Sequence, residues 1–369
     1  MANMTNNLPI AADELIYAPL ASESIYQSGP CLLADIGGTN ARFALALGSR
    51  QIVHIRVLAC ADYPDLKAAI AAYLAQIHLS KIEHAAIAIA NPVNGDEVRM
   101  TNHHWCFSIE ATRNALALQT LLVINDFTAL AMSLPYLSTS QYEQIGTGQR
   151  RSGSPMGLLG AGTGLGVSAI IPWRDQWFAL QSEGGHRSFS PSDKTEMQLL
   201  EWLWQKFSHV SAERLASGPG IVLIYQALID IYAVKNKTRL HPTYLPSPDS
   251  DVLTKGALTA REIVYCAHQG DALCIEALRL FSAILGSIAG DLALTLGSTG
   301  GVYIGGGVVN QLGTLFDAMI FRQRFTAKGR FSHYLEQIPT YRITAKYPAF
   351  IGISMMLEAQ LNSMSSRSV

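Results

Sequence analysis

The sequence predicts an α/β protein built from two similar sheet-and-helix domains. First, a strand, a glycine-rich turn and a second strand occur twice, around residues 31–47 and 157–171. Second, apolar runs of strand length alternate with segments of helical period. Third, 369 residues, of which 49% are hydrophobic, suffice for two domains with their own cores.

In the first half of the chain, a helix is expected over residues 65–79, where apolar residues recur at helical spacing. A second helix is expected directly after Asp126. The apolar runs and alternating segments predict strands at Leu32–Asp35, Arg42–Leu47, 51–59, 85–90 and 121–125.

In the second half, the strand–turn–strand unit at 157–171 precedes a mostly helical region that starts at Asp193. One further strand is expected in the glycine-rich segment 300–309, and a last helix at 348–361. The apolar stretch 281–297 contains Asp291 and many small residues, which favours a buried helix over a membrane span.

Composition narrows the choice of partners and compartment. The net charge of −1 gives no electrostatic footprint for nucleic acid or an anionic membrane. Five scattered cysteines form no CxxC pair, which is typical of reduced thiols in a cytosol. The first 30 residues lack the basic start and apolar core of a signal peptide. We therefore expect a cytoplasmic protein with no nucleic-acid or membrane partner.

The two glycine-rich turns need an explanation, because glycine weakens strands. Gly37-Gly38 can serve a hairpin turn that requires positive φ, or it can let backbone N–H groups approach a phosphate. Asp35 favours the second interpretation, since a carboxylate beside a phosphate can hold Mg²⁺ through water. No GxxxxGK[ST] motif is present, and the turn at 160–166 leads into a strand, whereas a dinucleotide fingerprint opens a helix.

Four polar residues are candidates for chemistry, each with a structural alternative. Asp126 follows a buried strand and is either a catalytic carboxylate or a helix N-cap. Glu183 and His186 flank two glycines; they could form a metal pair, His186 could be a core histidine, or both could bind a ligand. Glu213 could be a solvated carboxylate at a helix end.

Five short motifs occur in a fixed order along the chain. They are DIGGTN (Asp35–Asn40), INDF (Ile124–Phe127), GAGTGLG (Gly160–Gly166), EGGH (Glu183–His186) and SGPG (Ser217–Gly220). This series resembles bacterial glucokinases, which share their fold with hexokinase, actin and the heat-shock chaperone ATPases. The similarity runs from about Leu32 to the C-terminus.

The resemblance implies a two-lobed actin-like ATPase (ribonuclease H-like) fold, with duplicated α/β domains and an interlobe cleft. It also implies an N-terminal extension at 1–28, a small domain of 29–134 plus 349–369, and a large domain of 135–348. The chain is also expected to form a homodimer.

The resemblance further implies phosphorylation of glucose at the 6-hydroxyl by Mg·ATP, a reaction of glycolysis. Asp126 corresponds to the general base, and Asp35 to the residue that holds Mg²⁺ through water. The sugar ligands correspond to Asn125, Glu183, His186 and Glu213, with Thr101 and Asn102 in a loop over the sugar. The nucleotide contacts correspond to Ala34, Asp35, Ile36, Gly37, Gly38, Thr39, Gly162, Thr163 and Gly164.

Two other functions remain open: a kinase for another hexose, and a sugar-sensing regulator without catalysis. The cysteine-rich zinc motif of the related repressor and open-reading-frame kinases is absent, which disfavours N-acetylated amino sugars as substrates. Arg187-Ser188 follow His186 where the family more usually has a hydrophobic–acidic pair.

Overall fold

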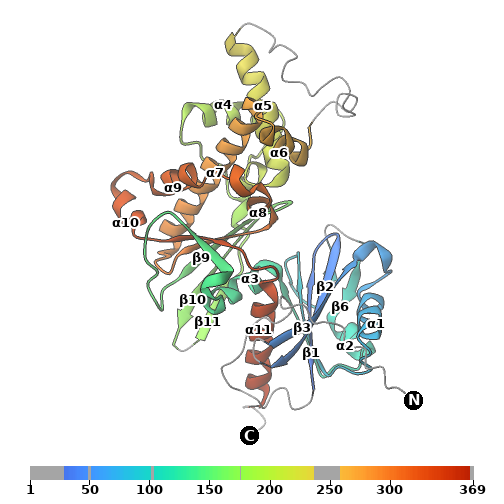
Figure 1. Cartoon of the computed structure of the whole chain (residues 1–369). Coiled ribbons are helices and arrows are strands. Elements are labelled where there is room, and N and C mark those ends of the chain that lie inside the picture. The colour runs from blue at the N-terminus through green and yellow to red at the C-terminus, as the bar shows by residue number, and fades with distance from the viewer. Residues whose placement is uncertain (1–28, 49–50, 101–103, 175, 237–257, 366–369) are drawn as a thin grey trace, which may run out of the picture. The chain divides into compact units, whose positions relative to one another are not determined.

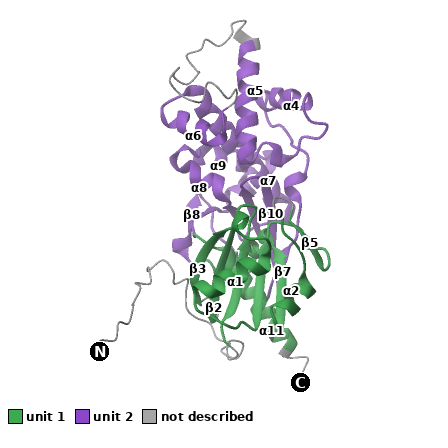
Figure 2. Cartoon of the chain, turned by 90° about the vertical axis from the view of Figure 1, so that its right-hand side faces the viewer, with its two compact units in different colours: residues 1–137, 346–369 green, residues 138–345 purple. Residues whose placement is uncertain are grey.

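The computed structural model describes residues 29–48, 51–100, 104–174, 176–236 and 258–365 (Figure 1). The chain divides into two compact units, coloured separately in Figure 2. Unit 1 takes in the chain up to Leu137 and from Lys346 on, and unit 2 is Ser138–Ala345.

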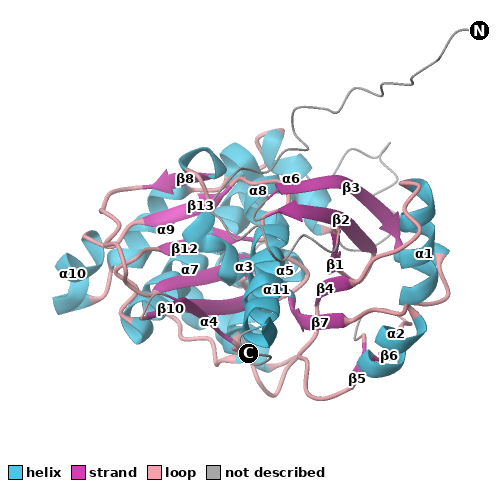
Figure 3. Cartoon of the chain, turned by 90° about the horizontal axis from the view of Figure 1, so that it is seen from below, coloured by secondary structure: helices cyan, strands magenta, loops and turns pink. Residues whose placement is uncertain are grey.

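Unit 1 is built on a five-stranded sheet of order β3-β2-β1-β4-β7 (Figure 3). The strands are β1 (Cys31–Ile36), β2 (Asn40–Gly48), β3 (Gln51–Ala59), β4 (His84–Ile89) and β7 (Thr120–Asn125). β1, β2 and β3 are antiparallel neighbours, whereas β1, β4 and β7 run parallel. Every residue of β4 is buried, as expected for a parallel strand covered on both faces.

The helices of unit 1 are α1 (Leu66–Gln76), α2 (Ile109–Ala115), α3 (Asp126–Ser133) and α11 (Ala349–Ser365). A small hairpin pairs β5 (Glu97–Arg99) with β6 (Cys106–Ser108). The C-terminal helix α11 packs on α3 and also contacts β1 and β4. All strands and helices expected in this half are confirmed, with ends shifted by a few residues.

Unit 2 contains a six-stranded sheet of order β11-β10-β9-β12-β13-β8. Its strands are β8 (Tyr142–Ile145), β9 (Met156–Ala161), β10 (Leu165–Trp173), β11 (Gln176–Leu180), β12 (Val302–Gly305) and β13 (Thr340–Ile343). As in unit 1, three antiparallel strands are followed by two that continue in parallel. The predicted duplication is therefore confirmed.

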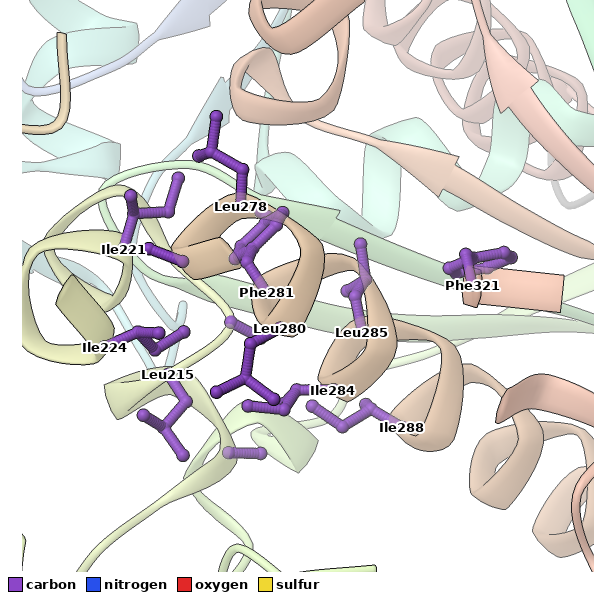
Figure 4. Packing of buried hydrophobic residues seen from close by; sticks show 14 of the residues in the cluster. Leu215, Ile221, Ile224, Leu278, Leu280, Phe281, Ile284, Leu285, Ile288 and Phe321 are labelled. Atoms are coloured by element: carbon purple, nitrogen blue, oxygen red, sulfur yellow. The ribbon is translucent and has the colours of Figure 1, made fainter. Parts of the chain in front are cut away.

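The helices of unit 2 include one long helix, α7 (Ala272–Leu296), on which several of the others pack. The helices are α4 (Lys194–Trp204), α5 (Gly218–Asn236), α6 (Ala260–His268), α7, α8 (Gly307–Leu312), α9 (Ala318–Thr326) and α10 (Ser332–Glu336). By length and composition α7 could cross a membrane, but 78% of its most apolar window is buried. Leu278, Phe281 and Leu285 pack among residues of α5 and α9 (Figure 4). The prediction of a buried helix here is confirmed.

Candidate functional site

The carboxyl ends of the parallel strands in unit 1 bring two motifs to one edge of the sheet. Asp35 of β1 is aligned with Ala88 of β4, and Asn125 of β7 is aligned with Ile89 of β4. Because β4 lies between β1 and β7, Asp35 and Asn125 are two strand spacings apart, roughly 10 Å. In the sequence these residues belong to separate motifs. In the folded sheet both lie at the edge formed by the carboxyl ends of the parallel strands.

Asp35 is half-buried and forms an ion pair across the hairpin. Arg42 Nη1 donates to Asp35 Oδ2 at 2.9 Å, and the two residues are direct partners in the β1–β2 register. Burial raises the pKa of Asp35, and the neighbouring guanidinium opposes that rise. Arg42 was not among the predicted site residues, although the antiparallel register of the two predicted strands could have identified it.

The turn from Gly37 to Thr39 is held by its own backbone and by Cys60. The Gly37 N–H donates to the Asn40 carbonyl at 3.0 Å, and the Cys60 N–H donates to the Thr39 carbonyl at 2.9 Å. The interpretation that the turn needs glycine for positive φ is wrong, because neither Gly37 nor Gly38 adopts one. A Cβ on Gly37 would meet only the Asn40 carbonyl oxygen, at an ordinary 3.6 Å.

Asn125 and Asp126 lie where β7 passes into α3. Asn125, and not Asp126, is the N-cap, since its Oδ1 accepts from the Thr128 N–H at 3.1 Å. The N-cap alternative for Asp126 is therefore wrong. Asp126 is the first helical residue, and its Oδ1 accepts from the Phe127 N–H at 2.8 Å and from Asn125 Nδ2 at 3.2 Å. These two donors orient the carboxylate at the edge of the sheet.

In unit 2, the turn between β9 and β10 contains Gly162, Thr163 and Gly164. The Gly162 N–H donates to the Gly164 carbonyl, and the Gly162 carbonyl accepts from the Gly218 N–H at the start of α5, both at 2.8 Å. Gly162 has no positive φ, and a Cβ on it would meet no atom within 4 Å. The fold itself therefore does not require glycine at this position.

Glu213 reaches the same turn. Its Oε2 accepts from the Leu165 N–H at 2.9 Å, and a Cβ on Gly164 would collide with that oxygen. Glu213 lies in a short 3₁₀ helix (Ala212–Arg214). The hydrogen bond to the Leu165 N–H fixes the position of its side chain. The alternative of a merely solvated helix-end carboxylate is thus wrong.

A second short 3₁₀ helix (Gly184–His186) lies beside β10; Glu183 is its N-cap residue and His186 its last residue. Glu183 Oε2 and His186 Nε2 are 4.0 Å apart, and their side chains are 67% and 62% exposed. The exposure excludes the core-histidine alternative. Among the residues that the structure describes, no group of three or more His, Cys, Asp or Glu side chains could hold a metal ion.

The two short helices of unit 2 are tied together by backbone pairing. The Ala212 N–H donates to the Arg187 carbonyl at 2.8 Å, and Ser188 forms an isolated antiparallel bridge with Ser211. The structure therefore groups Glu183, His186 and Glu213 around the start of β10. Thr101 and Asn102 lie outside the described residues.

Comparisons with known proteins point to one family. A family model described as Glucokinase matches residues 32–360. The glucokinase of Chromobacterium violaceum is 47% identical over 340 residues, which are 92% of each chain. The bifunctional protein glk of Burkholderia orbicola is 55% identical over 92% of this chain but only 50% of its own length. The chain thus spans about half the length of such bifunctional relatives.

The fold has a similar counterpart among solved structures. The crystal structure of a glucokinase from an Antarctic psychrotroph matches with a TM-score of 0.77 and 34% sequence identity. The match covers 89% of this chain and 99% of that one.

Proposed function

The chain belongs to the glucokinase family and has its two-sheet α/β fold, from which we propose that it phosphorylates glucose at the 6-hydroxyl with ATP. One observation carries the proposal: the Asp126 carboxylate is oriented at the carboxyl edge of three parallel strands, where ligands meet open α/β sheets. In phosphoryl transfer, catalysis consists mainly of positioning and charge stabilisation. Asp126 acts as the base that accepts the proton of the 6-hydroxyl.

The proposed sugar ligands are four polar side chains. Asn125, Glu183, His186 and Glu213 bind hydroxyl groups of the ring. The exposure of Glu183 and His186 supports this role, because the larger part of each polar side chain is open to a ligand. A site with several such groups discriminates strongly against analogues that lack one hydroxyl.

The nucleotide phosphates bind at the two glycine-rich turns. The N–H groups of Gly37 and Gly162 donate within their own turns. A Cβ would meet nothing at Gly162 and only one ordinary contact at Gly37, which supports a role in which the missing side chains let an anion approach the other N–H groups of each turn. The further contacts of Ala34, Ile36, Gly38, Thr39, Thr163 and Gly164 belong to the same proposal.

Asp35 fits a water-mediated Mg²⁺ site. Arg42 engages its Oδ2, which leaves Oδ1 to accept from a metal-bound water. Mg²⁺ keeps several waters and is usually held by one or two carboxylates plus substrate phosphates. When bound, the ion would neutralise charge on the phosphates, while Asp35 would fix its position.

Replacing Gly162 by alanine tests the nucleotide turn. Because the new methyl group meets nothing in the protein, we expect the free energy of unfolding to be nearly unchanged. The KM for ATP should rise about tenfold, since hydrogen bonds to charged phosphates are weakened. Gly48→Ala, at a strand end with only ordinary contacts, is the control. An unchanged KM for ATP would show that the turn is structural only.

An assay of ADP release across a panel of hexoses tests the proposed reaction. Highest kcat/KM with glucose supports it, and preference for another hexose supports the second candidate. Sugar binding by calorimetry without ADP release would instead indicate a sensing protein.

Further proposals concern organisation. We place the small domain at 29–134 plus 349–369, the large domain at 135–348 and an extension at 1–28. The division into two compact units supports two domains. A cytoplasmic homodimer is part of the same proposal, and light scattering of the purified chain tests the dimer.

A further inference from the structure

We infer that Asp291 is a positioning residue for the sugar-binding turn Glu183–His186, which it anchors to helix α7 through Arg187. This inference rests on the proposed role of His186 in sugar binding. Asp291 lies 104 residues away from Arg187 along the chain, and nothing in the local sequence around either residue predicts the contact.

The anchor consists of one carboxylate between two cations. Arg187 Nη2 is 3.5 Å from Asp291 Oδ2, and Lys328 Nζ is 2.6 Å from Asp291 Oδ1. Both oxygens of the carboxylate are thus engaged by different parts of unit 2. Without Asp291, two partly buried positive charges would face each other with no counter-charge between them, so Arg187 would move away.

Arg187 is placed where its movement must affect the sugar ligands. It follows His186 directly, and its N–H donates to the Gly184 carbonyl at 3.4 Å. Its own carbonyl accepts from Ala212, the residue before Glu213. A shift of Arg187 therefore reaches His186 through the chain and Glu213 through the backbone bond.

Helix α7 is a firm point of attachment. Its central residues are buried, and it packs closely on α9. Gly290 precedes Asp291, and a Cβ there would collide with the backbone carbonyl oxygen of Phe325 in α9. Glycine at this position thus lets α7 and α9 pack closely beside Asp291.

If Asp291 only stabilised the fold, its replacement would have a different effect from the one expected of a positioning residue. Partly exposed ion pairs contribute little to folding stability. If Asp291 acts on the turn, its loss should alter sugar binding while the melting temperature changes little. If it only holds α7 and α9 together, any effect should fall on stability.

The test compares Asp291→Asn with a matched control on the same helix. Glu276 pairs with Arg279 at 3.4 Å and its side chain is 33% exposed, against 36% for Asp291, so Glu276→Gln removes a similar charge away from the turn. We expect Asp291→Asn to raise the KM for glucose roughly 3- to 10-fold, with kcat and the KM for ATP within about twofold. Glu276→Gln should leave all three unchanged.

A double-mutant cycle tests whether Asp291 affects glucose binding through Arg187. After Arg187→Met, the further change Asp291→Asn should add less than about twofold to the KM for glucose, because the two residues act as one unit. Full additivity would overturn the inference, as would an equal rise in the KM for glucose with Glu276→Gln.

Hydrogen exchange separates this inference from the proposed function. The His186 and Arg187 amides, which bond to Glu183 and Gly184, should exchange faster in Asp291→Asn than in Glu276→Gln without any ligand. If the wild-type protein neither binds nor phosphorylates glucose, the proposed function fails, yet faster exchange still supports the anchor. Unchanged exchange at these amides overturns it.

Discussion

Replacing Asp126 by asparagine should lower kcat for glucose by about 10²–10⁴, the usual loss when a general base is removed. Asparagine keeps the size of the side chain, and its oxygen can still accept from the Phe127 N–H. The turn between β7 and α3 should therefore stay intact, and glucose should still bind. What is lost is the carboxylate that we propose as the acceptor of the 6-hydroxyl proton.

Two measurements make this prediction specific. Calorimetry should show glucose affinity within a few-fold of wild type, and a coupled assay should show the loss in kcat. Asp271→Asn is the matched control, because Asp271 caps α7 at a turn between two helices of unit 2, its Oδ1 accepts from the Leu273 and Cys274 N–H groups, and asparagine caps equally well. If Asp126→Asn turns over glucose at more than about a tenth of the wild-type rate, Asp126 is not the base.

Most of the fold could be predicted because the local sequence patterns agree with the strands and helices that form. The strand β1, the glycine turn and β2 are visible as two apolar runs separated by DIGGTN, and the same pattern marks β9 and β10. β8, β11 and β13 were not predicted. They are only four or five residues long, and β8 and β11 have mixed exposure at the edges of the sheet. Short strands of this kind are specified by their neighbours rather than by their own pattern.

For the candidate site, the sequence identified residues but not their contacts. It placed Asn125 and Asp126 at a strand-to-helix junction, yet assigned the alternative capping role to Asp126, whereas Asn125 performs it. The pairing of Glu213 with Leu165 and of Asp291 with Arg187 joins distant segments. Such contacts depend on the packing of unit 2, which no local period or motif encodes.

The crossing of α3 and α11 depends on a glycine that the sequence shows only as one residue of an apolar helix. A Cβ on Gly352 would collide with the Ala129 carbonyl oxygen and lie 3.0 Å from the Ser133 nitrogen. These are backbone atoms of α3, so no side chain can rotate away to relieve the overlap. Since α3 begins at Asp126, the same crossing also supports the end of the helix where Asp126 lies.

Gly352→Ala should lower the free energy of unfolding by roughly 3 kcal/mol, the upper end of the usual cost of overpacking. Alanine gains about 1 kcal/mol of helix propensity over glycine, so propensity alone predicts the opposite sign. Urea denaturation of the whole chain measures the change, with Gly48→Ala as a control in the same unit that introduces only ordinary contacts. A Gly352→Ala protein as stable as that control would mean that α11 can move off α3 freely. In that case the helix crossing would not be what holds the Asp126 end of α3 in place.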